Sequence, residues 1–138
     1  MIQASAFHAK ALAAIHAEAF PPGANWSEAA FATLLGQPGV FGLLDPTGAF
    51  VLARQAADEA EVLTLATSAA IRREGRAKKL LTAMHERLRA DGAAQIFLEV
   101  AADNVAAHDL YLGLGYGRAG VRKAYYGPVD AWVMRLNL

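Results

Sequence analysis

The chain has 138 residues, a length typical of one domain. Its 13 Lys and Arg residues balance 13 Asp and Glu residues, which disfavours general nucleic-acid binding because that requires a basic face. The absence of cysteine excludes disulfide scaffolds, Cys-ligated zinc, iron–sulfur clusters and thiol nucleophiles. No apolar run approaches the ~18 residues of a membrane span, and the N-terminal segment lacks the basic start of a signal peptide. We therefore expect a cytoplasmic protein without a membrane partner.

Hydrophobic periodicity and turn signals predict helices and strands throughout residues 1–138, which we expect to form a single domain. The first half predicts strand, helix, helix and three strands, over Ile2–Ala4, Ala9–Ala19, Glu28–Leu35, Val40–Leu44, Ala49–Ala56 and Glu61–Thr67. The second half predicts helix, strand, helix and two strands, over Ile71–Asp91, Ile96–Val100, Val105–Leu114, Gly117–Tyr125 and Ala131–Leu136. The strand–helix–strand unit implies a parallel pair, and the hairpins imply antiparallel neighbours. The expected fold class is α/β, with a mixed sheet of about seven strands and about four helices.

The segment from Arg72 to Lys79 is the most informative for function. It carries five of the 13 cations within eight residues and lies between a buried strand and an amphipathic helix. Unpaired N–H groups and the helix dipole attract anions to a helix N-terminus, and Gly75 permits close approach of the backbone. The pattern predicts a phosphate site, with a solvated basic helix end or an RNA-binding patch as the alternatives.

A motif within this segment and two sets of residues elsewhere in the chain resemble those of a known family. The motif Arg72-x-x-Gly75-x-Ala77 resembles the pyrophosphate loop of the GNAT superfamily of acetyl-CoA-dependent N-acetyltransferases. A later run is similar to the family's N-x-x-A-x-x-L-Y-x-x-x-G-F signature, through Asn104, Ala106–Ala107, Leu110–Tyr111 and Leu114-Gly115-Tyr116. Within the superfamily the chain resembles the RimI-type ribosomal-protein N-terminal alanine acetyltransferases, through Asn25-Trp26-Ser27 with Phe31, Leu98-Glu99-Val100 and Arg122-Lys123-Ala124-Tyr125-Tyr126. The resemblance extends over essentially the whole chain.

The chain departs from the family pattern at three places. Arg76 fills a position that Ile or Leu often holds, and Ala77 replaces the commoner Gly. The segment from Tyr126 to Asp130 is shorter than is usual in RimI-like enzymes. The first two departures bear on cofactor affinity, and the third bears on the identity of the acceptor.

The resemblance implies a GNAT fold and direct transfer of an acetyl group from acetyl-CoA to an amine. The implied acceptor is a protein N-terminal α-amine, for example that of a ribosomal protein. A small-molecule amine or a lysine is the alternative acceptor, and a CoA-binding module without turnover is the alternative of another class. The residues implied to bind acetyl-CoA are Leu65, Ala66, Thr67, Arg72, Arg73, Glu74, Gly75, Arg76, Ala77, Lys78 and Asn104.

The resemblance also implies roles for individual side chains. Glu99 matches the general base, acting directly or through water, although a rim glutamate paired with a surface cation is the structural alternative. Tyr111 matches the general acid that protonates the leaving thiolate, although its spacing also suits a core tyrosine. Asn104 also fits a helix N-cap. Tyr125 and Tyr126 are expected to be partly structural and partly a wall of the acceptor site.

The four histidines share no metal-ligand spacing and have no carboxylate cluster beside them. No metal is therefore expected.

Overall fold

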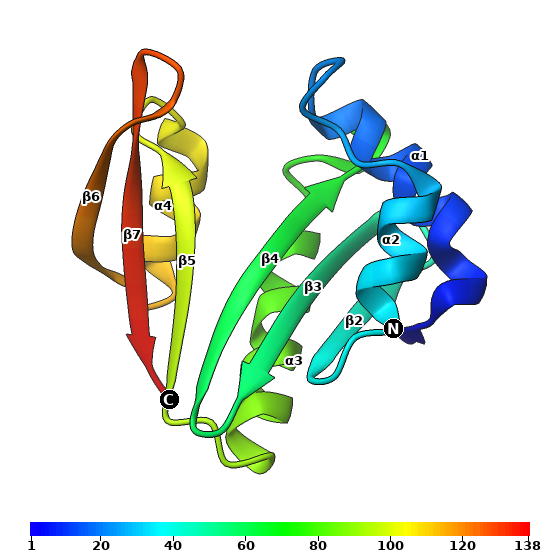
Figure 1. The fold of residues 1–138 in the computed structure, drawn as a ribbon, viewed down its shortest axis with the longest axis horizontal. Coiled ribbons are helices and arrows are strands. Elements are labelled where there is room, and N and C mark those ends of the chain that lie inside the picture. Colours follow the sequence, from blue (N-terminus) through cyan, green and yellow to red (C-terminus); the bar gives the residue numbers. More distant parts are fainter.

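The computed structural model describes residues 1–138, apart from the side chain of Tyr126. The strands form one mixed sheet of seven strands in the order β1-β2-β3-β4-β5-β7-β6. Their bounds are β1 Ile2–Ala4, β2 Val40–Asp45, β3 Ala49–Ala56, β4 Glu59–Thr67, β5 Gln95–Ala101, β6 Gly117–Tyr126 and β7 Val129–Asn137. Strands β2 to β7 can be followed in Figure 1. The α-helices and 3-10 helices are η1 Ala6–His8, α1 Ala9–Ala19, α2 Glu28–Leu35, η2 Ala69–Ile71, α3 Arg76–Ala90 and α4 Val105–Gly113. The predicted fold class is confirmed.

Local signals define several helix ends. The Ser27 hydroxyl accepts a hydrogen bond from the Ala30 N–H at 3.1 Å and so caps α2, as an N-cap serine is expected to do. The prediction was wrong at the start of the long helix, which begins at Arg76 rather than at Ile71. Arg73 and Gly75 have φ values of +66° and +76°, so the chain cannot continue as a right-handed helix through this loop.

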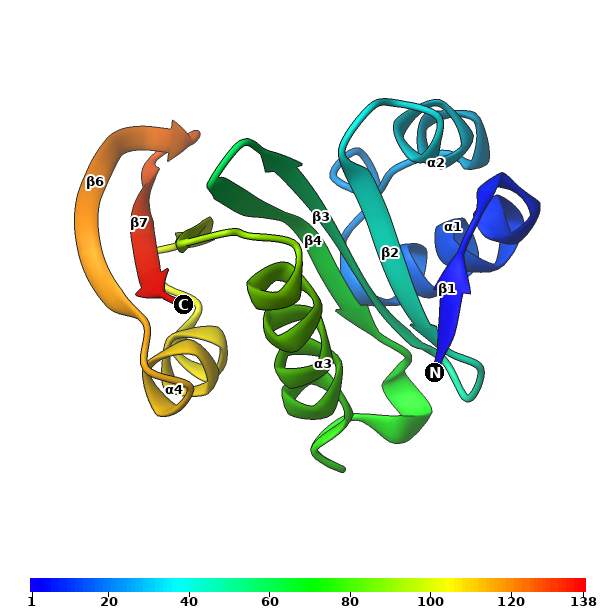
Figure 2. The same ribbon diagram turned by 90° about the horizontal axis from the view of Figure 1, so that it is seen from below.

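The sheet is covered by helices on both faces (Figure 2). Helices α3 and α4 pack on one face, in a core cluster that includes Val51, Leu81, Met84, Ile96 and Met134. Helices α1 and α2 pack on the other face of β1–β4, in a cluster that includes Leu12, Phe31 and Phe50. Among the described residues, no helix is both long and apolar enough to cross a membrane.

Strands β4 and β5 run parallel but stay paired only at their beginnings. The register joins Glu59–Glu61 to Gln95–Phe97, and beyond these residues the two strands diverge (Figure 1). Strand β7 inserts between β5 and β6 and pairs antiparallel with both. A register shift in the β3–β4 ladder places an extra residue, Leu63, in β4 shortly after the point where the strands part. The sheet therefore opens in its middle.

Candidate active site

A pocket of about 790 Å³ lies where β4 and β5 separate. Residues of β3 to β7 line it, together with one residue of the loop between α1 and α2. Its lining includes the side chains of Trp26, Glu61, Phe97, Glu99, Arg122 and Tyr125. Apolar, acidic and basic groups thus converge on one cavity, as is common in small-molecule and peptide sites.

Glu99 reaches this pocket because of the alternation of side chains along β5. Leu98 and Val100 are buried in the cluster beneath α3 and α4, so Glu99 between them faces the opposite side of the sheet. Its side chain is 26% exposed, and its Oε1 lies 2.9 Å from Nε of Arg122 in β6. Among the described residues this carboxylate has no second ion-pair partner.

Arg122 is a partner of Glu99 that the sequence alone did not reveal. Its guanidinium also lies 5.4 Å from the ring centre of Tyr125, which is half exposed and lines the same pocket. The contact matches the structural alternative, a rim glutamate paired with a surface cation, and it also holds the carboxylate at the pocket wall. The geometry thus permits both interpretations of Glu99. The side chain of Tyr126 lies outside the described residues.

Tyr111 lies in a different environment from Glu99. It is buried in α4, and its ring meets the Tyr116 ring edge-to-face with centres 5.6 Å apart. It belongs to the core cluster that contains Leu98 and Val100, and so approaches β5 from the face opposite to Glu99. The predicted acid and base are therefore on two sides of the divided sheet.

The end of β4 offers backbone groups at the opening. Leu65, Ala66 and Thr67 pair with β3 on one edge. On the other edge, the described register with β5 ends at Glu61. Peptide groups along this second edge have no neighbouring strand in the described chain, and an extended ligand could pair with them as an additional strand does.

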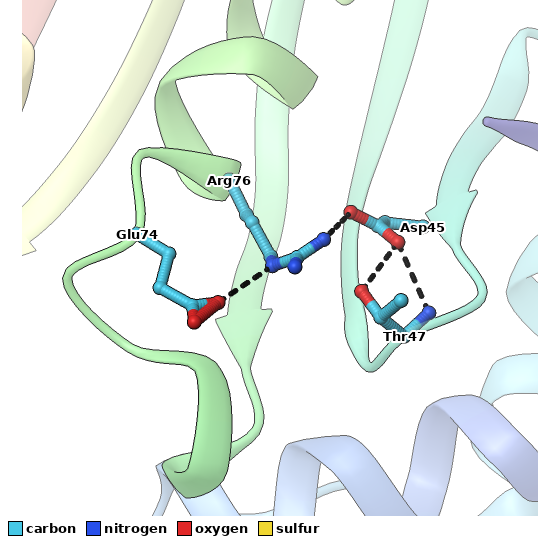
Figure 3. Close-up of polar contacts among 4 residues, drawn as sticks. All are labelled: Asp45, Thr47, Glu74 and Arg76. Carbon is cyan, nitrogen blue, oxygen red and sulfur yellow. Dashed lines mark hydrogen bonds and ion pairs between the residues drawn. The ribbon is translucent and has the colours of Figure 1, made fainter.

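Two of the five loop cations bind protein groups. The Arg72 guanidinium donates hydrogen bonds to the main-chain oxygen of Thr67 at 3.2 Å and to that of Glu18 at 2.6 Å. The Arg76 guanidinium lies 3.0 Å from an Asp45 oxygen and 3.1 Å from a Glu74 oxygen (Figure 3). These two arginines tie the loop to the rest of the fold.

The other three cations are Arg73, Lys78 and Lys79. All are exposed, and no ion pair joins them to a described residue. Gly75 is the N-cap of α3, and no side chain caps this helix. A Cβ atom at Gly75 would meet no heavy atom within 4 Å, so the space beside the first turn is open. Free N–H groups, an open approach and three unpaired cations together can bind a phosphate group.

Asn104 caps α4, because its Oδ1 accepts a hydrogen bond from the Ala107 N–H at 3.2 Å. The capping role is therefore confirmed. Among the described residues, no three His, Cys, Asp or Glu side chains form a group that could hold a metal ion.

His16 is a buried polar residue whose environment the sequence did not reveal. Its Nδ1 accepts a hydrogen bond from the Trp26 N–H at 3.1 Å, and its Nε2 lies 3.1 Å from the Thr64 hydroxyl. Phe20 stacks on the ring with centres 4.1 Å apart. Burial lowers the pKa of His16 to about 4, so the ring is neutral at physiological pH. The ring thus joins α1 to the pocket residue Trp26 and to β4.

Comparison with known proteins places this geometry in a family. The model of the acetyltransferase (GNAT) family matches residues 10–116. The ribosomal protein bS18-alanine N-acetyltransferase of Escherichia coli strain K12 is 35% identical over 129 residues, covering 88% of this chain and 84% of the relative.

Two solved structures have the same fold. The crystal structure of the E. coli ribosomal-protein-S18-alanine N-acetyltransferase superposes with a TM-score of 0.85 at 30% identity, over 99% of this chain and 92% of that one. Ard1 from Thermoplasma volcanium superposes with a TM-score of 0.86 at 19% identity, over 99% and 95% of the two chains, a likeness that shows the fold alone.

Proposed function

The chain belongs to the GNAT family of acetyltransferases and is an acetyl-CoA-dependent N-acetyltransferase, and we propose that its acceptor is the α-amino group of a protein N-terminus. The observation that carries the proposal is the position of Glu99 in the pocket where β4 and β5 part. The name of the E. coli relative, which covers most of this chain, supports a ribosomal protein that begins with alanine as the acceptor.

The proposed reaction uses the two faces of the divided sheet. On the Glu99 face, the carboxylate takes a proton from the acceptor amine, directly or through a water molecule. The amine nitrogen forms a bond to the thioester carbonyl carbon, and the carbon–sulfur bond then breaks. On the opposite face, the Tyr111 hydroxyl supplies a proton to the leaving thiolate. The transfer needs no acyl-enzyme, which is consistent with a chain that has no cysteine.

The donor is proposed to lie along the open edge of β4 and the first turn of α3. Leu65, Ala66 and Thr67 offer backbone groups to the pantetheine arm and to the thioester oxygen. The residue Asn104 flanks the arm from the start of α4. The phosphates lie at the N–H groups from Gly75 to Lys78, and the unpaired cations Arg73, Lys78 and Lys79 surround them.

An α-amine suits a site with one carboxylate base. Its pKa is near 8, whereas that of lysine is near 10.4, so the α-amine is roughly a few hundred times more often neutral at pH 7. Tyr125 and Tyr126 are proposed to contact the backbone of the acceptor peptide. Because the segment after Tyr126 is short, we expect little selectivity beyond the first residues of the peptide.

A competition assay tests the acceptor. Thiol release from acetyl-CoA is measured with peptides that begin with alanine, with the same peptides carrying a blocked α-amine and a free lysine, and with small polyamines. We expect turnover of the first class only. A comparable rate with the blocked, lysine-bearing peptide would exclude the N-terminal assignment, and preference for a polyamine would favour a small-molecule acceptor.

A further inference from the structure

The turn between β2 and β3 contacts the start of α3 through one ion pair (Figure 3). The Asp45 Oδ2 atom lies 3.0 Å from Nη1 of Arg76. The other carboxylate oxygen accepts hydrogen bonds from the Thr47 N–H at 3.0 Å and from the Thr47 hydroxyl at 2.6 Å. Asp45 also pairs with Ala49 in the β2–β3 ladder. These contacts hold the carboxylate at the end of β2 independently of its contact with Arg76.

Both side chains of the pair are charged at neutral pH. Hydrogen bonds from the Thr47 side chain and backbone, followed by the contact with Arg76, lower the pKa of Asp45 to about 2. The carboxylate is therefore ionised throughout the neutral pH range. The Asp45 and Arg76 side chains are 20% and 30% exposed, so water screens their attraction only in part.

The position of Arg76 makes this contact consequential. Arg76 is the first residue of α3, where a cation opposes the helix dipole. The loop before it contains Arg73 and Gly75, both with positive φ, and the positive value is strained for the arginine. A side chain anchored at the end of this loop can hold its backbone in place.

We propose that Asp45 is a positioning residue for donor binding: it anchors Arg76 and thereby fixes the first turn of α3 in the shape that receives the phosphates. The inference rests on the proposed function, because it assumes that this turn binds the phosphates of acetyl-CoA. It differs from the sequence-based expectation, in which Arg76 itself contacts the ligand. It also gives Arg76, a departure from the family pattern, a partner in Asp45.

A double-mutant cycle separates the two roles of Arg76. The variants are Asp45→Asn, Arg76→Met and the double variant, assayed for the KM of acetyl-CoA, the KM of the acceptor peptide and kcat. If Asp45 acts through Arg76, each single change raises the KM of acetyl-CoA about three- to tenfold, and the double change raises it no further. The peptide KM and kcat stay unchanged.

Two variants serve as controls. Asp91→Asn makes the same change in an ion pair with Arg87 at the other end of α3 and should leave every parameter unchanged. Arg76→Lys keeps the charge and can still pair with Asp45, so it should recover part of the lost affinity.

The outcomes are distinct. An unchanged or lowered KM in Asp45→Asn, or additive effects in the double variant, would overturn the positioning role. Calorimetry with CoA on the same variants keeps the two proposals apart. A wild-type protein that binds CoA but releases no thiol contradicts the proposed function, and the affinities of the variants still decide the role of Asp45. A wild-type protein that binds no CoA overturns both.

Discussion

Glu99 and Tyr111 are the side chains on which the proposed chemistry depends, and their surroundings differ. Glu99 is partly exposed and paired with Arg122. Tyr111 is buried against Tyr116. The ion pair holds Glu99 Oε1, which leaves the second oxygen of the carboxylate for an acceptor amine or a water molecule. A variant of Glu99 can therefore be tested by its turnover, whereas a variant of the buried Tyr111 needs measurements of both turnover and stability.

Replacing Glu99 with Gln should lower kcat by about 10²–10⁴, the usual contribution of a general base. Gln keeps the size of the side chain and an oxygen that can accept from Arg122, so CoA affinity measured by calorimetry should not change. Glu86→Gln, at an exposed site on α3, is the matched control. If Glu99→Gln turned over as fast as the wild type, the role of Glu99 would be limited to its ion pair with Arg122.

Tyr111→Phe and Tyr116→Phe should affect different properties. The Tyr116 hydroxyl lies 2.7 Å from Nε2 of buried His85, so removing it leaves a buried polar group unpaired and costs about 1–3 kcal/mol of stability. Tyr111→Phe should lower kcat, with the KM of acetyl-CoA unchanged. Urea unfolding and thiol release measure the two effects. Equal turnover in Tyr111→Phe and the wild type would show that Tyr111 serves only as a core residue.

Among the helices and strands, the predicted bounds agree best where a local signal sets them. Ser27 and the turn Asp45–Gly48 define α2 and the β2–β3 hairpin in the sequence as they do in the structure. The start of α3 was mispredicted because the loop conformation depends in part on a distant acceptor, the main-chain oxygen of Glu18, to which Arg72 donates a hydrogen bond. The insertion of β7 between β5 and β6 was not predicted either, because strand order depends on pairing between distant segments.

The same distinction holds for the candidate site. The sequence identified Glu99 and the loop through short motifs. It did not identify the contacts of Glu99 with Arg122, of Arg76 with Asp45 or of His16 with Thr64. Each joins residues far apart in the chain, and no local pattern or charge count specifies which partners will meet.

The first turn of α3 predicts a contrast between two glycines. Gly75 and Gly92 flank α3, have φ values of +76° and +88°, and leave open space for a Cβ atom. An alanine at either position therefore costs a similar amount of stability, about 1 kcal/mol. Only Gly75→Ala should weaken CoA binding, because its methyl group occupies the approach to the phosphate site. Calorimetry and thermal unfolding of both variants check this, and equal CoA affinities would argue against the assigned site.

Two buried histidines, His16 of α1 and His85 of α3, predict that the stability of the fold decreases in acid. Burial lowers the pKa of His16 to about 4, below the unfolded value of 6.5, and burial lowers that of His85 to about 4 as well. Below pH 6.5 the unfolded chain takes up protons that the folded chain does not bind. Stability is therefore full above pH 6.5 and falls as the pH approaches 4, by up to about 3 kcal/mol for each histidine.

Urea unfolding across this pH range measures the effect, and His16→Gln provides the comparison. Gln can still donate a hydrogen bond to Thr64 but does not titrate. The variant should therefore lose stability at neutral pH and show a shallower decline toward acid. A decline as steep as that of the wild type would show that His16 is not a source of the acid sensitivity.

At the scale of the whole molecule, the junction between β4 and β5 is narrow, and it determines whether the two parts of the sheet unfold together. Strands β1–β4 and strands β5–β7 are directly paired only through Glu59–Glu61 and Gln95–Phe97. The cluster beneath α3 crosses this junction, because Leu80 and Met84 share it with Val51 on one side and Met134 on the other. We propose that this common core makes residues 1–138 a single domain despite the divided sheet.

The two tryptophans report separately on the two parts. Trp26 packs beside His16 near α1 and α2, and Trp132 of β7 stacks on His108 of α4 with ring centres 4.0 Å apart. Fluorescence of Trp26→Phe therefore follows the β5–β7 part, and fluorescence of Trp132→Phe follows the β1–β4 part. Because the core is shared, each fluorescence transition in urea should coincide with the circular-dichroism transition of the same variant. A fluorescence transition that precedes it would show that one part unfolds independently, and the single-domain assignment would fail.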